Sequence, residues 1–432
     1  MNQNTERLRR ELGLGGAILL GLGSMVGTGV FVSIGVAAGV AGPSVILAVL
    51  IGAAVALANG LSSAQLAANH PVSGGTYEYG YRYLRPWLGF SAGWLFLLAK
   101  SASAATAAQG FAGYALSALG VHSPGLRTGV AVVTVLVVTA VVMGGVRRSN
   151  RANTAIVVVT FGALIFFIFA GLSRLDPGNF TPFLAAPGDA PGGLSGLLTA
   201  SALMFVAFTG YGRIATMGEE VQDPRRIIPK AIVLTMIVTL LLYMGVAVAG
   251  IGAAGAAGMS GAVAVNAAPL ESIMLGLGIP GGGAILAVGA IAAMLGVLLN
   301  LILGLSRVLL AMGRRGDMPS AVARLDATGS TPILAVLVMG GVVAGFALIG
   351  DVRVTWSFSA FTVLVYYALT NLAALQLRGA DRLYPAWIAW AGLGACLFLA
   401  FWVDAIILAA GVGLLAIGLG WHWPARRSQG KI

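Results

Sequence analysis

The chain has 432 residues, of which 58% are hydrophobic and only 9% are charged. An ordinary soluble domain places charge on about 25% of its residues, so this composition excludes a soluble globular protein. Apolar runs of 18 or more residues recur from position 13 to position 420, and each can cross a bilayer core about 30 Å thick. The sequence therefore predicts an all-α polytopic membrane protein with a single membrane domain.

Hydropathy and turn residues divide the chain into about twelve spans. We expect transmembrane helices at 13–39, 43–69, 87–119, 128–146, 150–172, 194–218, 228–252, 283–312, 332–350, 354–377, 383–402 and 405–421. An even number of spans places both termini on the same side of the membrane.

The basic residues test this count, because Lys and Arg concentrate in cytoplasmic loops. Twenty of the 25 lie on the side of the N-terminus, and only Arg127, Arg174 and Arg353 lie on the opposite side. Lys100 and Arg213 fall within spans. The pattern predicts a multi-pass protein of the inner membrane with both termini in the cytoplasm. It also assigns the net charge of +11 to membrane topology and excludes nucleic acid as a partner.

Several function classes lack the residues they need. Cys396 is the only cysteine, so there is no intramolecular disulfide and no cysteine cluster for a metal. His70, His122 and His422 are scattered at span ends without metal-ligand spacing, and no Gly-rich loop with Lys and Ser or Thr is present to bind ATP. The N-terminus lacks the pattern of a cleaved secretory signal. We predict no enzyme activity, no metal and no cofactor.

The first span is unusually rich in glycine and hydroxyl residues. Glycines stand at 21, 23, 27 and 29, with Ser24 and Thr28 between them. Gly-rich backbone in the middle of a membrane can unwind, and a half-helix that restarts after the break presents free N–H groups to a carboxylate. The alternative interpretation is close helix packing of the Gly-xxx-Gly kind.

A second interrupted span favours the binding-site interpretation. The sixth hydrophobic segment contains Thr209, Gly210, Gly212 and Arg213. Paired breaks in the first and sixth spans are expected for an inverted repeat of five plus five helices, with a substrate at the midplane between them. The predicted organisation is an N-terminal cytoplasmic segment 1–12, repeats at 13–172 and 194–377, peripheral helices at 383–421 and a cytoplasmic tail at 422–432.

Four stretches in this order resemble the amino acid, polyamine and organocation (APC) transporter superfamily, and the resemblance extends over nearly the whole chain. They are Gly23-Ser-Met-Val-Gly-Thr-Gly-Val-Phe31, Pro71-Val-Ser-Gly-Gly-Thr-Tyr77 with Gly89-Phe-Ser-Ala-Gly-Trp94, Gly218-Glu-Glu-Val-Gln-Asp-Pro-Arg-Arg-Ile-Ile-Pro229, and Ser306-Arg-Val-Leu-Leu-Ala-Met312 with Gly316-Asp-Met-Pro319. The resemblance implies an amino acid permease with a LeuT-type fold.

The resemblance also implies roles for residues at the two breaks. Gly27, Thr28 and Gly29 are expected to hold a substrate carboxylate, and carbonyls near Val206, Ala207 and Phe208 to hold its ammonium. Phe205 or Phe208 is expected to help close the pocket. Ser24, Thr209 and Gly210 complete the predicted substrate-binding set.

This sequence departs from its relatives at two charged positions. Relatives commonly carry Asp or Glu shortly after Gly210, where this chain has Arg213. Many relatives also carry a lysine in the fifth span, at the position of Thr160 here. Lys100 is the candidate for that displaced role, because a lysine deep in the membrane costs at least about 2.5 kcal/mol to insert and marks a functional site. The alternative is a structural cation bonded to carbonyls of a broken helix.

These observations together predict a secondary active transporter of a small amino acid that works by alternating access. Lys100 makes proton linkage or exchange the expected coupling, and the absence of Ser or Thr between Ala284 and Leu305 argues against sodium. The alternatives are a polyamine or organic cation transporter and a membrane substrate sensor without transport. The expected partners are a small-molecule substrate and the lipid bilayer.

Overall fold

The computed structural model describes residues 12–72, 74–145, 150–188, 190, 192–216, 221–326 and 331–427. Parts of four predicted segments lie outside these ranges: residues 1–11 of the N-terminal segment, residue 146 of the span 128–146, residues 217–218 of the span 194–218, and residues 428–432 of the tail. Within the described residues the chain is helical, with an isolated bridge between Leu12 and Val221 and no strand. Nine helices there are long and apolar enough to cross a membrane, and two shorter apolar helices accompany them. The prediction of an all-helical membrane protein is confirmed.

The expected first span is not one continuous helix. It consists of α1 (Leu14–Met25), a π-helical turn η1 (Gly29–Ser33) and α2 (Ile34–Ala41). A 3-10 turn η2 (Gly42–Ser44) then leads into α3 (Val45–Asn69). Gly42 has a φ of +63°, which an L side chain rarely adopts, so glycine permits the sharp turn before Pro43.

The next four helices include one that the hydropathy pattern did not predict. α4 (Thr76–Tyr83) is a short polar helix, and it is followed by α5 (Pro86–Ala118), α6 (Pro124–Met143) and α7 (Asn150–Leu172). α5 and α6 each begin with proline, whose fixed φ and missing N–H suit the first helical position. Small buried residues such as Ala102, Ala105 and Ala108 let neighbouring helices approach the centre of α5 closely.

The sixth expected span is also interrupted. After the 3-10 turn η3 (Pro177–Phe180), the chain forms α8 (Gly193–Phe208), the 3-10 turn η4 (Thr209–Tyr211) and α9 (Gly212–Thr216). α10 (Pro224–Asn266) consists of two helical parts that meet at Gly255, whose φ of +65° is not helical, so the first part ends close to the expected end at Gly252. α11 (Pro269–Gly276) and α12 (Gly282–Arg315) follow.

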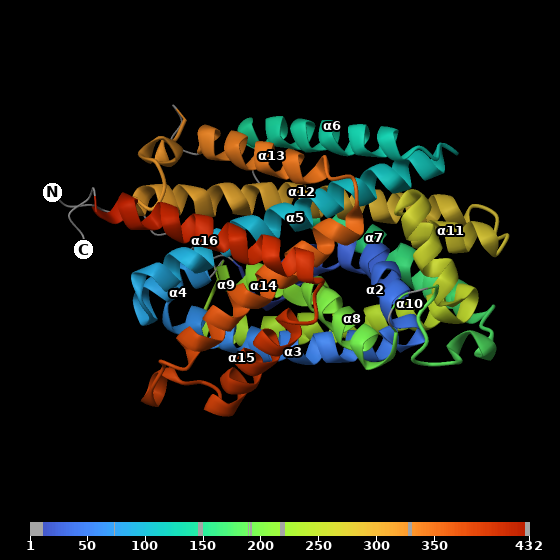
Figure 1. The fold of residues 1–432 in the computed structure, drawn as a ribbon, viewed down its shortest axis with the longest axis horizontal. Helices are drawn as coiled ribbons and strands as arrows, with labels where there is room; N and C mark the ends of the chain where they lie inside the picture. Colours follow the sequence, from blue (N-terminus) through green and yellow to red (C-terminus); the bar gives the residue numbers. More distant parts are fainter. Residues whose placement is uncertain are drawn as a thin grey trace.

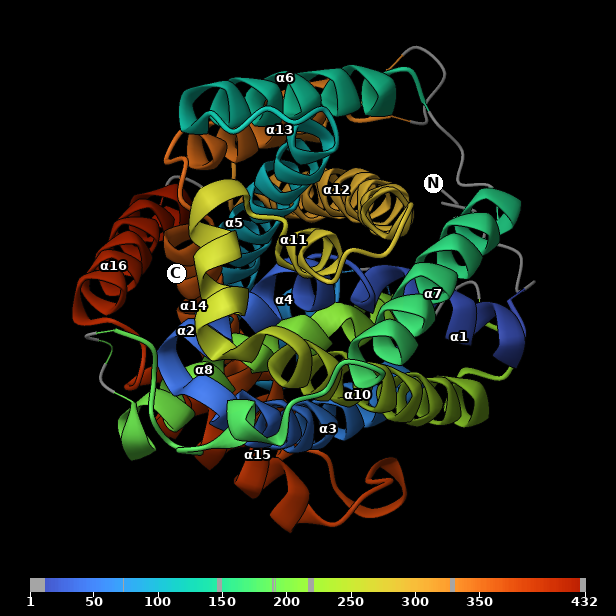
Figure 2. The same ribbon diagram turned by 90° about the vertical axis from the view of Figure 1, so that its right-hand side faces the viewer.

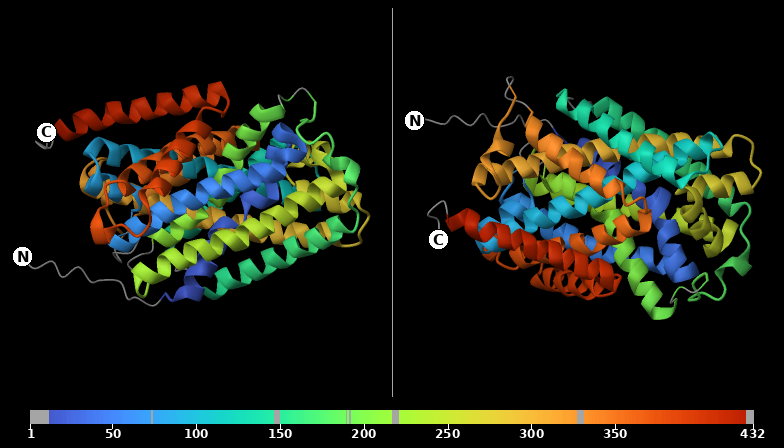
Figure 3. Two further views of the ribbon diagram at one scale, coloured as in Figure 1. Left: turned by 90° about the horizontal axis from the view of Figure 1, so that it is seen from below. Right: turned by 45° about the horizontal axis from the view of Figure 1, so that its top comes forward.

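The remaining helices are α13 (Ile333–Ala347), α14 (Val352–Ala374), α15 (Ala386–Ala400) and α16 (Ala405–Arg427), with 3-10 turns η5 (Ser320–Ala323) and η6 (Gly379–Asp381) between them. α16 extends beyond the expected end at Trp421. It lies on the outside of the bundle, as Figure 3 shows, and packs against α5 and α14.

The long helices run roughly parallel along the longest axis of the molecule, with α4 at one end and α11 at the other (Figure 1). α5 lies near the centre and packs against both α12 and α14. Viewed from the α11 end, α3, α10 and α15 lie on one side of the bundle, and α6 and α13 lie on the opposite side (Figure 2).

Candidate functional site

The two helix interruptions lie side by side near the middle of the bundle. α1 ends at Met25, Val26 adopts an extended conformation, and the helix restarts at Gly29. A Cβ atom at Gly29 would lie 2.6 Å from the Cβ of Ala207, and one at Gly210 would overlap the carbonyl of Ser24. Only glycine therefore allows the backbones of the two breaks to approach this closely.

Tyr243 of α10 connects the two breaks. Its hydroxyl lies 2.7 Å from the carbonyl oxygen of Met25 and 3.3 Å from that of Ala207, and its side chain is fully buried. These carbonyls lie at or near the ends of α1 and α8, where helical partners are missing. Tyr243 was not predicted. Its signal in the sequence was its place after Thr235 and Thr239, at a spacing of four residues in an otherwise apolar segment.

A cavity of about 120 Å³ opens between the breaks and helices α5, α12 and α14. Most of the predicted binding residues line it, and these are Ser24, Thr28, Gly29, Lys100, Val206, Ala207, Thr209 and Gly210. Gly27 instead faces Val297, to which a Cβ would come within 2.6 Å. Phe205 and Phe208 lie behind the wall, where Phe205 packs on Tyr367 and Phe208 packs on Tyr243.

The restart of the first helix offers hydrogen-bond donors to the cavity. The amides of Val30 and Phe31 both donate to the carbonyl of Gly27, so the amides of Thr28 and Gly29 precede the first bonded turn. Thr28 is 4% exposed, and its hydroxyl has no hydrogen-bond partner among the described residues. A buried hydroxyl in this condition is costly unless a ligand binds it. The arrangement can hold an anionic group.

The end of α8 offers acceptors, although two of them already accept hydrogen bonds. The carbonyl of Val206 accepts a hydrogen bond of 2.8 Å from the Thr209 hydroxyl, and that of Ala207 accepts one from Tyr243. The Val206 carbonyl also accepts the backbone N–H of Thr209, so both of its lone pairs are used. An ammonium group at this end would share these carbonyls with protein side chains.

Lys100 of α5 reaches the break in the sixth span. Its Nζ donates a hydrogen bond of 2.9 Å to Oγ1 of Thr209. The same face of α5 carries two more polar contacts, from Ser103, 2.7 Å from Ser359, and from Thr106, 2.8 Å from Thr355. Lys100 therefore faces the interior of the bundle and contacts a side chain at the break. The alternative interpretation, a structural cation, predicted backbone carbonyls as its partners.

Several residues of the cavity wall were missed by sequence reasoning. They are the aromatic side chains Phe96, Trp356, Tyr366 and Tyr367, together with Asn300. Trp356 donates to the carbonyl of Leu203, and Tyr367 to that of Thr209 at 3.3 Å. Arg213, whose role the sequence left open, also lines the cavity.

The amino acid permease model matches residues 16–426 of the chain. The chain belongs to the amino acid permease family. The resemblance to the APC superfamily is thereby confirmed, and the family consists of transporters, not enzymes.

The names of this permease's relatives differ, and only some of them state a substrate. An uncharacterized transporter of Mycobacterium tuberculosis strain H37Rv is 40% identical over 418 residues, 96% of this chain and 91% of the relative. Branched-chain amino acid permease BcaP of Bacillus subtilis is 27% identical over 450 residues, covering 98% and 95%. Cationic amino acid transporter 3, mitochondrial, of Arabidopsis thaliana is 28% identical over 388 residues, covering 86% and 63%.

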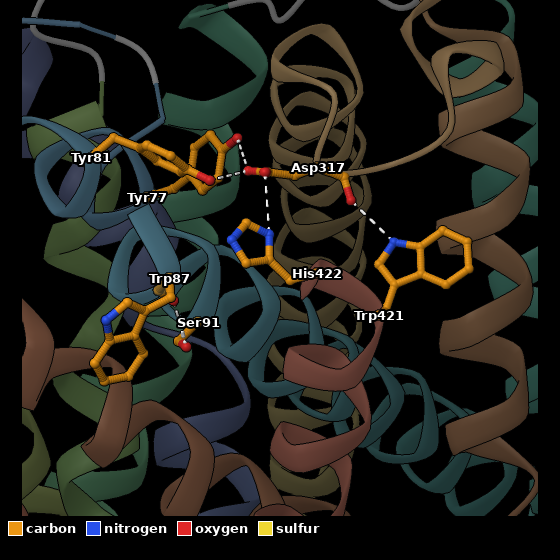
Figure 4. A network of polar contacts seen from close by, with 7 residues as sticks. All are labelled: Tyr77, Tyr81, Trp87, Ser91, Asp317, Trp421 and His422. Carbon is orange, nitrogen blue, oxygen red and sulfur yellow. Dashed lines mark hydrogen bonds and ion pairs between the residues drawn. The ribbon is translucent and has the colours of Figure 1, made fainter. Parts of the chain in front are cut away.

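A second polar cluster of the permease lies away from the cavity, at the end of the bundle that holds α4 (Figure 4). The Asp317 carboxylate accepts hydrogen bonds of 2.7 Å from Tyr77 and 2.6 Å from Tyr81, both on α4. From α16, His422 Nδ1 lies 3.4 Å from Asp317 Oδ1, and the Trp421 indole donates to the Asp317 carbonyl. Asp317 thus joins α4, the end of α12 and α16, so α16 is tied to the bundle by more than apolar packing.

Proposed function

We propose that this permease is a secondary active transporter that moves a small amino acid across the cytoplasmic membrane by alternating access. The observation that carries the proposal is the cavity between two adjacent helix breaks, into which an unbonded threonine hydroxyl and a lysine side chain project. Discontinuous helices that meet at mid-membrane form the substrate site of many secondary transporters.

The proposed topology has twelve spans in a LeuT-type inverted repeat, with the first repeat at 13–172 and the second at 194–377. In this interpretation α1 to α2 and α8 to α9 are the discontinuous first and sixth spans. α15 and α16 are the peripheral helices of segment 383–421. The distribution of Lys and Arg supports an inner-membrane location with both termini in the cytoplasm.

The proposed substrate pose uses the opposite polarity of the two breaks. The amides around Gly27 to Gly29 and the Thr28 hydroxyl bind the α-carboxylate, and the carbonyls from Val206 to Phe208 bind the ammonium. Ser24, Thr209 and Gly210 shape the space between them. Closure of the pocket by Phe205 or Phe208 requires one of these buried rings to move into the cavity.

Lys100 is the proposed coupling residue. Lys100 lines the cavity and donates a hydrogen bond to Thr209. A change in its protonation would therefore alter a contact at the break of the sixth span. Proton linkage or substrate exchange therefore fits better than sodium coupling, since α12 has no Ser or Thr from Ala284 to Leu305 to contribute oxygen ligands.

The second candidate, an organic cation or polyamine carrier, draws support from the relative named as a cationic amino acid transporter. The described wall of the cavity opposes it, because Lys100 and Arg213 are cationic and no described lining residue is Asp or Glu. Placing a further cation among like charges in a low-dielectric site is unfavourable.

A thermal-shift screen of the purified full-length protein tests the proposal. A ligand that binds the folded state raises the melting temperature by mass action. We expect at least one L-amino acid to raise it in a concentration-dependent manner, and putrescine and spermidine to have no effect. A shift with polyamines alone would favour the second candidate.

A further inference from the structure

Packed side chains separate the cavity from the end of the bundle that holds α11. On α5 the last residue that lines the cavity is Ser103, and residues 104–118, which lead toward α11, do not line it. Gly110 lies in this closed part, where a Cβ atom would lie 2.7 Å from Met294 Sδ and 3.1 Å from Val32 Cγ2. Both of these side chains are fully buried. The first span, α5 and α12 therefore meet tightly on this side of the cavity.

α11 packs against the restarted half of the first span at this end of the bundle. It lies opposite α4 (Figure 1), which is the outer side of the membrane in the proposed topology, and it contacts α10, α12 and η1. A Cβ atom at Gly35 of α2 would lie 3.3 Å from Pro269 Cβ, at the start of α11. From α5, the Tyr114 hydroxyl donates a hydrogen bond of 2.9 Å to the carbonyl of Phe31 in η1. These contacts hold α11, α5 and the first span together.

A carboxyl group is buried in the same contact. Glu271 of α11 lies beside Tyr114, the titratable side chain that faces it, and shares a hydrogen bond with the Ser117 hydroxyl, which also accepts one of 3.1 Å from Asn266. Glu271 is buried, and its Oε2 has no hydrogen-bond partner among the described residues. Tyr114 carries no charge near neutral pH and cannot neutralise a carboxylate. Burial without a cation favours the protonated form of a carboxyl group.

The helices around Glu271 bring no cation to it in the described part of the chain. Glu271 is the only charged residue of α11. The charged residues of the neighbouring helices lie at the level of the cavity or farther from α11, namely Lys100 on α5, Arg151 on α7, those between 225 and 230 on α10 and those between 307 and 315 on α12. Ionised Glu271 would therefore depend on water for its stabilisation, and water reaches it only if α11 separates from its neighbours.

We propose that Glu271 is a proton-binding site on the outer side of the protein, and that the bound proton keeps α11 closed against the first span. This inference rests on the proposed topology and alternating access, and it adds a site separate from Lys100. Burial raises the pKa of Glu271 to about 7 in the closed form, whereas a carboxyl group in water titrates near 4.5. The proton therefore binds the closed form more tightly than the open form, and opening of the outer side is favoured as the pH rises.

The test measures how readily a reagent added outside reaches the closed part of the full-length protein. Val32→Cys and Met294→Cys, each in a Cys396→Ser background, are two independent reporters, because both positions are buried between the cavity and α11. A membrane-impermeant thiol reagent is added to right-side-out vesicles at a series of outer pH values and a constant inner pH. Each labelling rate is divided by that of Ser123→Cys, in the exposed loop between α5 and α6, which corrects for the effect of pH on thiol reactivity.

The reporters are compared in three backgrounds. The first has the native Glu271, and the second carries Glu271→Gln, whose neutral amide resembles the protonated carboxyl group. The third carries Asp404→Asn as the matched control, because Asp404 is an exposed acid in the loop between α15 and α16.

With native Glu271, we expect the relative labelling of the reporters to rise by up to about tenfold between about pH 6 and about pH 8, the ratio expected for a carboxyl group with these two pKa values. Glu271→Gln should keep labelling low at every pH, and Asp404→Asn should resemble the native background. The inference is overturned if labelling does not depend on the outer pH, or if it rises equally in Glu271→Gln. Either result, together with uptake of an amino acid, would leave the proposed function intact. Failure of the reagent to reach Ser123→Cys from outside would overturn the proposed topology and this inference with it.

Discussion

Lys100 and Thr209 are 109 positions apart in the chain, and their side chains are joined by a hydrogen bond of 2.9 Å between Nζ and Oγ1. Lys100 lies on an uninterrupted helix, whereas Thr209 begins the 3-10 turn that interrupts the sixth span. The bond therefore links a rigid element of the bundle to the segment where the backbone changes geometry. Protonation of Lys100 can shift an equilibrium between two conformations only if the proton binds the two conformations with different affinities.

Replacement of Lys100 tests its coupling role. We expect Lys100→Met, which keeps the length of the side chain and removes the charge, to abolish the response of uptake to an inward proton gradient while substrate binding is retained. Lys230→Met is the control, because Lys230 is exposed on α10. Uptake that still follows the proton gradient in Lys100→Met would refute the assignment. A requirement for sodium would refute the proton as the coupling ion.

A side chain at Gly29 should disrupt the proposed substrate site. A Cβ there would lie 2.6 Å from Ala207 Cβ, and a β-branched residue also restricts the backbone, so Gly29→Val should abolish amino acid binding in the thermal-shift assay. Gly341→Val on α13 is the matched control, since a Cβ at Gly341 meets nothing within 4 Å. Neighbouring Gly340 is unsuitable, because a Cβ there would collide with Thr139. Unchanged affinity in Gly29→Val would contradict the proposed anion site.

Hydropathy was sufficient to predict most of the helices, because a bilayer requires long apolar segments with internally bonded backbone. It missed α4, which is short and polar, and it missed the second helical part of α10, which follows the break at Gly255. The glycine pattern also indicated Ser24, Thr28, Gly29, Thr209 and Gly210, all of which line the cavity. It was not sufficient for Gly27, which faces Val297.

The remaining wall of the cavity depends on which faces of buried helices converge. α10 carries Thr235, Thr239 and Tyr243 at a spacing of four residues, and α14 carries a hydroxyl stripe at helical spacing, so the sequence did mark the faces that turn inward; the stripe of α14 consists of Thr355, Ser359, Thr362, Tyr366 and Thr370. Trp356 and Tyr367 lie beside this stripe, and their hydrogen bonds to the carbonyls of Leu203 and Thr209 depend on tertiary packing. The sequence alone contained no signal for the contact of His422 with Asp317.

The Asp317 cluster predicts a structural role for the end of α16. Asp317 is 1% exposed and accepts two tyrosine hydroxyls, so Asp317→Asn should destabilise the protein by on the order of 2 kcal/mol and lower its melting temperature in detergent. Asp381→Asn is the comparison, because Asp381 is exposed. Equal melting temperatures for both variants would show that the cluster does not stabilise the junction of α4, α12 and α16.

Glu271 on α11 predicts a dependence of stability on pH. It is 2% exposed, its Oε2 has no hydrogen-bond partner among the described residues, and burial raises its pKa to about 7, while a hydrogen bond with Ser117 opposes the shift. The unfolded chain releases this proton near the ordinary value of 4.5, so the folded protein binds more protons between these values. Stability should therefore fall as the pH rises through this window, and the contribution is lost above about pH 7.

Glu271→Gln should remove the loss of stability that accompanies ionisation of Glu271 at higher pH. We expect its melting temperature to exceed that of the wild type by on the order of a few degrees at about pH 8 and to approach it at about pH 5. The measurement is a series of melting curves across this range in one detergent. Parallel curves for the two proteins would contradict a buried, neutral Glu271.

The account is tested most directly by the accessibility of the cavity itself. Cys396 is the only native cysteine and is buried, so Ser24→Cys in a Cys396→Ser background places one reactive thiol in the cavity wall. The rate of its modification by a membrane-permeant maleimide is measured with and without a saturating concentration of the amino acid found in the thermal-shift screen. Ser123→Cys, in the exposed loop between α5 and α6, serves as the control. We predict that the amino acid slows modification at position 24 and leaves position 123 unchanged. Equal rates at position 24 with and without a transported amino acid would contradict a substrate site between the two helix breaks.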